Sequence, residues 1–463
     1  MGDWEASITL EVIEAPLDHS HTFRLRRFLN WFPLGLTYAA MYMGRYNFNI
    51  VKNDIGAWYH LDKAQMGFIA SAGFWTYGLA VALNGPLADR IGGRKAILIG
   101  SLGAALVNLL VGLMFLNGDA SKVLVSMSLL WSLNMYFQSF GALSVVKVNS
   151  TWFHVKERGV FGGIFGIMIS SGYFLATTIG AWLLASFRSW TVIWFVPAAA
   201  MTFMFVVDWF LVRNRPSHTG HVDFDTGDGS NAASAEDAPL PLRDLAQKVF
   251  RNPIIVSLIF AEFCTGFVRQ GVMLYFTEYL EEIYHLGKKE HLFWWTGIAF
   301  MGGGILGGLL CGWMSDKLFQ SRRPPVAFIF YLMQVVMLGL LGLTLGQGST
   351  SGQILAVILL GLTAMFIFGV HGMLSGTASM DFGGRKAAAS VAGALDGVQY
   401  IGSGLTGFGL GWILKTYGWD GVASQGHQPT HAWIWVGCII PFSLIGAFIM
   451  TRIWNAKAGA GAH

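Results

Sequence analysis

Two arginines, Arg45 and Arg269, are the side chains of this sequence best suited to binding chemistry. Each lies in the middle of a long apolar stretch, and at that depth in a membrane a charged side chain costs at least about 2.5 kcal/mol. A guanidinium stays charged when it loses its water, and its planar fork can hold two oxygens of a phosphate or carboxylate. The pair therefore predicts a site for an anion.

The two arginines occupy similar places in an internal repeat. The segment Gly85–Arg90 returns as Gly312–Lys317, and the basic turn at 156–159 returns at 384–386 with the same offset. Arg269 follows Arg45 by nearly the same interval. A repeat of this length indicates two homologous halves, because solenoid repeats are much shorter.

The composition places the chain in a membrane. Hydrophobic residues make up 54% of the chain and charged residues only 12%, and the mean hydropathy is +0.52. Since about 20 apolar residues cross the hydrocarbon of a bilayer, we expect an all-α membrane protein with twelve transmembrane helices in two pseudo-symmetric six-helix bundles. The expected spans are 28–50, 65–88, 95–117, 122–147, 159–186, 190–212, 253–280, 292–316, 325–346, 352–378, 387–414 and 431–454.

The basic residues of the connections give the orientation. Lysine and arginine are far more frequent in the connections on the side of the two chain ends, and basic loops remain in the cytoplasm. We therefore expect both termini on the cytoplasmic side. The expected parts are an N-terminal tail (1–27), a first bundle (28–213), a polar linker mobile in its middle (214–250), a second bundle (251–455) and a C-terminal tail (456–463).

Polar side chains follow the arginines along their helices. Tyr38, Tyr42 and Arg45 stand at i, i+4 and i+7, and so share one face of the first span. In the seventh span, Tyr275 follows Arg269 by six residues. These side chains are expected to line the anion site.

Two other polar side chains are candidates with an equal structural alternative. Gln138 shares a face of the fourth span with Asn134, and Tyr77 lies near Asn84 in the second span. Each either bridges helices or touches the ligand.

Three titratable residues within the spans are candidates for coupling or counter-charge. Glu262 lies two turns before Arg269, Asp396 lies in the eleventh span, and His371 lies in the tenth. In the functional interpretation one of them carries a coupling proton. In the structural alternative the two carboxylates neutralise the two arginines, and the histidine is a hydrogen-bonded packing residue.

Charged turns at the membrane surface predict a gate. Asp89, Arg90 and Arg94 follow the second span, and Asp316 and Lys317 end the eighth. We interpret them as a charged latch between neighbouring helices that opens during transport, in addition to their contribution to topology.

Several functional classes are excluded by what the sequence lacks. The net charge of +4 comes from the expected cytoplasmic loops, so it calls for no nucleic-acid partner. There is no Walker loop and no hydrolase motif, and the three cysteines have unrelated spacings. We expect no enzymatic activity, no cofactor and no metal.

The chain resembles a known family at several motifs. The Asp-Arg-x-Gly-Gly-Arg-Lys turn after the second span is similar to the loop signature of the major facilitator superfamily. Other segments look like the organophosphate:phosphate antiporters, the family of bacterial glycerol-3-phosphate and hexose-phosphate transporters. They are 38–48, 137–138, 152–159, 268–271, 311–317 and 418–421.

The resemblance implies the major facilitator fold and a transport activity. In that family the arginines that match Arg45 and Arg269 bind phosphate, with tyrosines matching Tyr38, Tyr42 and Tyr77 nearby. The implied activity is exchange of internal phosphate for an external phosphorylated metabolite by alternating access. The chain lacks the family's fifth-span histidine, and its Asp396-Gly397 is similar to the hexose-phosphate branch.

Two alternatives remain open at this point. One is a sensor of transporter fold that binds a sugar phosphate, and the other is a proton-coupled symporter of organic anions that uses Asp396 or Glu262. In each case we expect a monomer in the cytoplasmic membrane, in contact with lipid.

Overall fold

The architecture of the chain comes from a computed structural model. It describes residues 19–117, 122–154, 167–168, 170–187, 189–224, 251–320, 322–344, 349–424 and 427–456, and of residues 86, 89, 376–390 and 392 only the backbone. In these residues helix is the only regular secondary structure. The all-α prediction is therefore confirmed.

The first half contains the following helices, with η3 a π-helix and η4 a 3-10 helix. They are α1 (His21–Tyr59), α2 (Lys63–Ile91), α3 (Gly93–Asn117), α4 (Val123–Gln138), α5 (Phe140–Asn149), η3 (Leu175–Ile179), α7 (Gly180–Phe187), α8 (Val192–Leu211) and η4 (Pro216–Thr219).

The second half has a similar set, with η6 a π-helix. Its helices are α10 (Pro253–Met273), α11 (Phe276–Ile283), α12 (His291–Lys317), α13 (Arg323–Leu343), α14 (Thr350–His371), η6 (Gly372–Ala378), α15 (Ser379–Tyr417) and α16 (Trp433–Arg452). Residues 19–224 are called the N-half below, and residues 251–456 the C-half.

Local sequence signals explain where the central helices begin and end. The Ser20 side chain accepts a hydrogen bond from the backbone N–H of Phe23 and caps α1. That helix ends at His60, whose left-handed backbone stops it. Asp62 and Gln65 then form a reciprocal capping box at the start of α2.

Eight helical segments of the described residues are long and apolar enough to cross a membrane. The four other predicted spans contain α1, α4 with α5, η3 with α7, and α15. The helix α1 carries Arg45, Lys52 and several asparagines in its buried part, which lowers its hydropathy. Helix α1 therefore falls below the hydropathy of a typical span, whereas the segment Pro253–Ile283, which carries Arg269, does not.

Three helix bounds differ from the predicted spans. The fourth span is two helices that meet at Ser139. The seventh is divided near Leu274 into α10 and α11. Helix α15 begins at Ser379 and includes 379–386, where the sequence predicted a connection.

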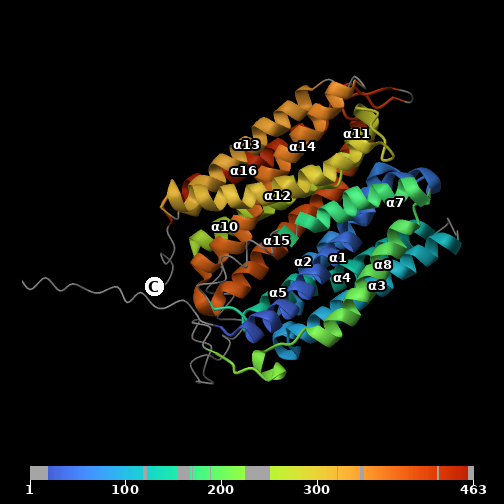
Figure 1. The fold of residues 1–463 in the computed structure, drawn as a ribbon. Helices are drawn as coiled ribbons and strands as arrows, with labels where there is room; N and C mark the ends of the chain where they lie inside the picture. The colour runs from blue at the N-terminus through green and yellow to red at the C-terminus, as the bar shows by residue number, and fades with distance from the viewer. Residues whose placement is uncertain are drawn as a thin grey trace, which may run out of the picture.

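The two halves meet along a few helices (Figure 1). The N-half is drawn in blue to green and the C-half in yellow to red, and α2 and α15 lie side by side between them. Helix α12 packs on η3, and α1 contacts α11. The helices with the two arginines, α1 and α10, are therefore both central.

An asparagine network fixes α1 within the N-half. The Asn47 amide donates to Asn108 Oδ1 at 2.9 Å and to the carbonyl of Ile193 at 3.0 Å. Asn108 donates to Asn134 Oδ1, and Asn134 donates to the carbonyl of Gly44 at 3.0 Å. Asn134 thus bridges helices, and the network holds the backbone next to Arg45 in place.

The halves are joined by ion pairs at one end of the molecule, which we call the distal end. It is the end opposite His19 and Ala456, where α1 ends and α2 begins. Lys63 Nζ lies 2.7 Å from Glu282 Oε2, Lys288 Nζ 2.7 Å from Asp54 Oδ2, and Lys415 Nζ 2.8 Å from Asp62 Oδ2. Each pair crosses between the halves.

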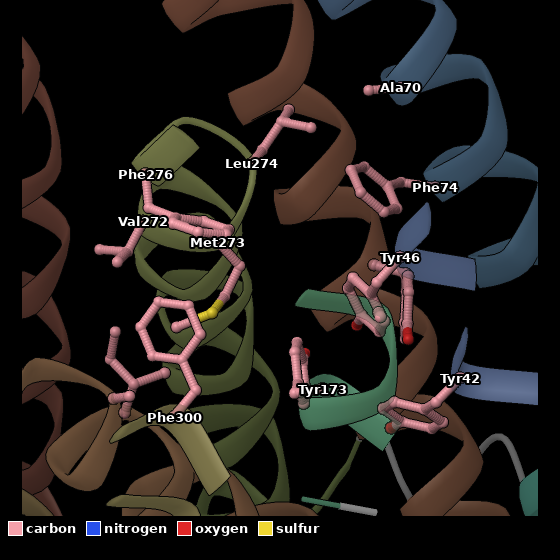
Figure 2. Packing of buried hydrophobic residues seen from close by; sticks show 14 of the residues in the cluster. Tyr42, Tyr46, Ala70, Phe74, Tyr173, Val272, Met273, Leu274, Phe276 and Phe300 are labelled. Atoms are coloured by element: carbon pink, nitrogen blue, oxygen red, sulfur yellow. The ribbon is translucent and has the colours of Figure 1, made fainter. Parts of the chain in front are cut away.

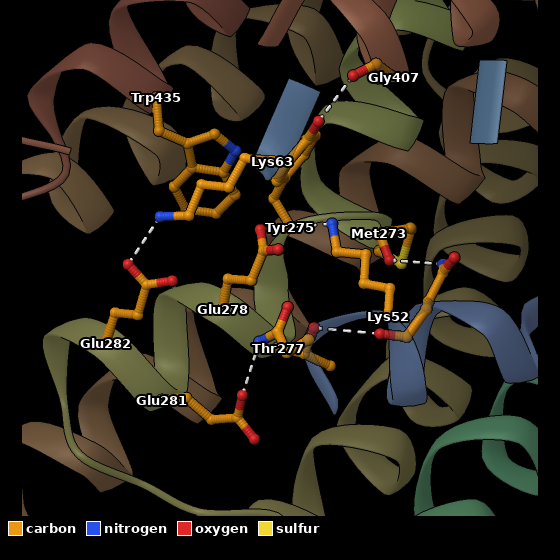
Figure 3. Close-up of polar contacts among 12 residues, drawn as sticks. Lys52, Lys63, Met273, Tyr275, Thr277, Glu278, Glu281, Glu282, Gly407 and Trp435 are labelled. Atoms are coloured by element: carbon orange, nitrogen blue, oxygen red, sulfur yellow. Dashed lines mark hydrogen bonds and ion pairs between the residues drawn. The ribbon is translucent and has the colours of Figure 1, made fainter. Parts of the chain in front are cut away.

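One distal ion pair is fully buried (Figure 3). Lys52 Nζ lies 3.3 Å from Glu278 Oε2 and 3.7 Å from the ring centroid of Tyr275. Next to it, Asn49 donates to the carbonyl of Met273 at 2.8 Å, and the hydroxyl of Thr277 donates to the carbonyl of Asn49. The halves are therefore closed on each other at the distal end.

Charge also favours this closure at the edge of the cluster. Partial burial disfavours the ionised form of Asp62, but its ion pair with Lys415 and the N–H of Gln65 together hold the pKa of that carboxyl below its ordinary value. The carboxyl therefore stays ionised as pH falls to its ordinary pKa of about 4. Its contribution to closure is present above that value and is lost only at more acid pH.

Replacing Lys52 by Met is expected to open the distal end. Glu278 would remain buried without its cation, which costs about 3 to 5 kcal/mol in the closed arrangement. The distance between spin labels on the distal ends of α1 and α11 should therefore increase. The double variant Lys52→Met with Glu278→Met should return to the wild-type distance. An unchanged distance in the single variant would contradict a closing role for the pair.

Candidate functional site

The first arginine is buried among neutral hydrogen-bonding groups. Arg45 is 1% exposed, and its Nη1 donates to the hydroxyl of Tyr400 at 3.2 Å. Its Nη2 donates to the carbonyl of Gln138 at 3.2 Å, and the Gln138 Oε1 lies 3.4 Å away. The guanidinium thus reaches from α1 to α4 and, across the seam between the halves, to α15.

Aromatic faces surround the same guanidinium. Its Cζ lies 4.5 Å from the ring centroid of Tyr42, 4.7 Å from that of Tyr77 and 5.8 Å from that of Tyr38. The electron-rich faces of these rings stabilise a cation without neutralising it. Arg45 therefore keeps its full charge available to a ligand.

The second arginine has unpartnered donors. Arg269 is also 1% exposed, and among the described residues its Nε and Nη2 have no hydrogen-bond partner. An unpaired buried donor costs about 1 to 3 kcal/mol, and more when it is charged. Arg269 is thus a guanidinium with unused capacity for an oxygen ligand.

Tyr400 lies between the two guanidinium groups. Its hydroxyl accepts from Arg45, and its ring centroid is 5.2 Å from the Cζ of Arg269. Its ring also stacks on Tyr77 at a centroid distance of 3.9 Å. Tyr400 was not predicted from the sequence, although Asp396 and Tyr400 stand at i and i+4 in the eleventh span.

Further aromatic side chains line the seam near the arginines (Figure 2). Tyr42, Tyr46 and Tyr173 form a group in the N-half, across from Met273 and Phe276 of the C-half. The ring centroids of Tyr46 and Tyr173 are 4.4 Å apart. Tyr46 also accepts from Gln270, the neighbour of Arg269, at 3.5 Å. Of this group Tyr42 was predicted from the sequence, whereas Tyr46 and Tyr173 were not.

The predicted pocket residues divide into two sets. Tyr38, Tyr42, Tyr77 and Gln138 all surround Arg45, as described above. Tyr275 lies elsewhere: its hydroxyl donates to the carbonyl of Gly407 at 2.7 Å, and its ring lies against Lys52. The end of α10 at Met273 turns Tyr275 towards the distal end, so we leave it out of the pocket.

The three titratable candidates, Glu262, His371 and Asp396, lie near one another and near Arg269. Glu262 is fully buried, and its Oε2 lies 3.6 Å from His371 Nδ1. The Gln399 amide is 2.7 Å from that same nitrogen. Asp396 is partly exposed and interacts electrostatically with both arginines, most strongly with Arg269.

The structural alternative, in which the two carboxylates neutralise the two arginines, agrees with the structure only in part. The hydrogen-bond partners of Arg45 are a tyrosine hydroxyl and a glutamine, and Glu262 lies 3.6 Å from a histidine. The carboxylates thus balance the charge of the arginines at longer range. The guanidinium groups are left to form hydrogen bonds with a ligand.

The predicted gate residues are only partly described. Asp316 forms an ion pair with Arg323 at 2.9 Å, which joins the end of α12 to the start of α13. Arg94 donates to the carbonyl of Trp209 at 2.6 Å and holds α3 to α8. Arg90 and Lys317 are exposed, and the side chain of Asp89 lies outside the described residues. The latch remains a hypothesis.

Two hollows in the described part of the chain lie away from the arginines. One, of about 300 Å³, is lined by apolar residues that include Phe260, Phe442 and Ile449, and another lies against Phe205 and Trp209. Both are on apolar outer surfaces of the helices. A ligand between the arginines would therefore replace contacts made by Tyr400 and its neighbours.

Two helical halves, with buried cations at the seam where they meet, define the class of alternating-access membrane transporters. Residues 34–407 match the Major Facilitator Superfamily, and the chain belongs to it. It is a multi-pass membrane transporter and not an enzyme.

Curated relatives extend over most of the chain. The membrane sensor protein UhpC of Salmonella typhimurium is 28% identical over 83% of this chain and 85% of its own. A glycerol-3-phosphate transporter of Bacillus subtilis is 26% identical over 86% and 88%. A probable hexose phosphate transport protein of Chlamydia pneumoniae is 26% identical over 86% and 87%. The resemblance to organophosphate transporters is thus confirmed.

Solved structures agree on the fold. A bacterial homolog of the human lysosomal transporter Spinster, in an inward-facing and occupied conformation, has a TM-score of 0.68 at 15% identity and covers 94% of this chain and 98% of its own. A point mutant of the nucleoside transporter NupG has a TM-score of 0.62 at 14% identity, with coverage of 94% and 100%. At these identities the similarity concerns the fold alone.

Proposed function

We propose that this transporter exchanges a phosphorylated metabolite, glycerol 3-phosphate or a sugar phosphate, for inorganic phosphate. The observation that carries the proposal is the pair of buried guanidinium groups, Arg45 and Arg269, one from each half, with Tyr400 between them. A phosphate dianion can accept hydrogen bonds from both forks at once. The Tyr400 hydroxyl accepts from Arg45 where we expect one phosphate oxygen to bind.

The proposal uses the closed distal end as one state of the transport cycle. In this state the halves contact each other beyond Lys52, so access to the arginines is from the end of the chain termini. We assign that end to the cytoplasm, on the cytoplasmic membrane, because it carries most of the basic loop residues. Rocking of the halves then exposes the same arginines to the other side.

Counterflow in proteoliposomes tests the exchange. Vesicles that contain the monomeric protein and are preloaded with phosphate are expected to take up external labelled hexose 6-phosphate, whereas vesicles loaded with phosphate-free buffer alone should not. Uptake that needs a pH gradient but no internal phosphate would contradict exchange and favour a proton-coupled symporter.

A sensor function is the second candidate. It is favoured by the 28% identity to the membrane sensor protein UhpC. A sensor needs the same ligand contacts but no turnover. Saturable binding of a sugar phosphate without counterflow would therefore support the sensor and contradict the exchanger.

A further inference from the structure

Several buried polar atoms near the arginines have no hydrogen-bond partner among the described residues. At the arginines they are the donors Nε and Nη2 of Arg269 and Nε2 of Gln138, with the Tyr173 hydroxyl and the Gln270 side-chain oxygen beside them. Towards the start of α10 they are acceptors alone, namely both carboxylate oxygens of Glu262 and the side-chain oxygen of Gln399. Buried groups of this kind need partners. A ligand for this site must therefore bring acceptors to one part and donors to the other.

The geometry around His371 leaves Glu262 with unused acceptor capacity, since a carboxylate can accept about four hydrogen bonds. In the orientation of the structure, the Gln399 Nε2 amide donates to His371 Nδ1 at 2.7 Å. That nitrogen then carries no proton, and it cannot donate to the Glu262 oxygen 3.6 Å away. The neutral ring instead presents its Nε2–H as a donor. The second N–H of the Gln399 amide and the backbone N–H of Ser375 lie towards Glu262, and the Gln399 oxygen has no partner among the described residues.

The acceptors lie at a definite distance from the arginines. Glu262 precedes Arg269 by seven residues on α10, which corresponds to about 10 Å of rise. Gln399 precedes Tyr400, which itself contacts Arg45. The acceptor group thus lies on α10 and α15 beside the phosphate position, on the side away from the distal end. His371, with a side chain 21% exposed, is its accessible edge.

We propose that Glu262, His371 and Gln399 form a hydroxyl-binding subsite that selects phosphate esters with a polyhydroxylated chain. This inference rests on the proposed function, because it requires the phosphate group at Arg45 and Arg269. The phosphate group of an ester dianion has no proton to donate and inorganic HPO₄²⁻ has a single one, whereas the several hydroxyls of a sugar are both donors and acceptors. The subsite therefore fits the organic part of the ligand. A six-carbon ester reaches further towards Glu262 than a three-carbon ester.

Binding of a ligand series to Glu262→Gln tests the subsite. The full-length protein in nanodiscs is titrated with inorganic phosphate, glycerol 3-phosphate and glucose 6-phosphate. We expect phosphate affinity within about two-fold of wild type and glucose 6-phosphate affinity lower by about 10- to 100-fold, as for loss of a hydrogen bond to a charged group. Glycerol 3-phosphate should lose less.

Three further variants make the test specific. Glu290→Gln, the same change at an exposed position, should alter none of the affinities. His371→Gln should weaken glucose 6-phosphate but not phosphate. Glu262→Asp, which keeps the charge, should lose less glucose 6-phosphate affinity than Glu262→Gln and guards against a folding defect in the latter.

The outcomes separate this inference from the function on which it rests. Equal weakening of phosphate and glucose 6-phosphate by Glu262→Gln would overturn the subsite, as would unchanged affinities for both. A change only in the pH dependence of transport would overturn it as well, in favour of a proton carrier. If wild type bound neither phosphate nor its esters, the proposed function itself would fail.

Discussion

Arg269→Lys is expected to reduce phosphate affinity by about 10- to 150-fold, and Arg45→Lys by a similar factor. Each arginine offers two or more donors in one plane, and a lysine ammonium cannot reproduce a bidentate contact. Loss of one charge-assisted hydrogen bond of about 1.5 to 3 kcal/mol already gives a factor of about 10 to 150. Isothermal titration of the purified variants with phosphate measures the effect.

The two variants should differ in stability. Arg45 also donates to Gln138 and Tyr400 within the empty protein, whereas the unpartnered donors of Arg269 have less to lose. Arg45→Lys should therefore lower the melting temperature more than Arg269→Lys. Arg452→Lys, at the exposed end of α16, is the matched control and should bind phosphate like wild type. Wild-type affinity in either Arg45→Lys or Arg269→Lys would contradict the assigned roles.

Gly411→Ala is expected to abolish counterflow by preventing distal closure. A Cβ at Gly411 of α15 would lie 2.5 Å from the backbone carbonyl oxygen of Lys63, which belongs to the other half. Because the Cβ at Gly411 and the Lys63 carbonyl are both fixed to the backbone, this clash can be relieved only if the two halves move apart. The closed state should therefore be lost while each half keeps its own packing. Counterflow and the spin-label distance across the distal end measure this.

The neighbouring glycine supplies the control. Gly409 lies on the same helix, and a Cβ there would meet no atom within 4 Å. Gly409→Ala should therefore retain counterflow and the wild-type distance. Normal transport in Gly411→Ala would show that close approach of α2 and α15 is not needed in the cycle.

Properties that depend on one helix at a time could be predicted from the sequence. The spacing of Tyr38, Tyr42 and Arg45 placed them on one helical face, and the structure gathers them around one guanidinium. The internal repeat identified Arg269 as the partner of Arg45. Hydropathy and the internal repeat also predicted an architecture of two halves, since both depend only on the order of residues along the chain.

Properties that depend on how distant helices meet could not be predicted. Tyr400 reaches both arginines only because α15 packs along the seam, and no local pattern encodes that approach. Tyr275 was misplaced because the sequence does not show that α10 ends at Met273. Lys52 and Glu278 were missed because each looks like an ordinary charge at a helix end until the two halves are brought together.

The central claim is that Arg45 and Arg269 together hold a phosphate group. A structure determined with bound phosphate tests it most directly. We predict a phosphate within hydrogen-bond distance of both guanidinium groups, with the Tyr400 hydroxyl no longer hydrogen-bonded to Arg45. A phosphate found on only one of the arginines, or bound elsewhere while Tyr400 still bridges them, would contradict it.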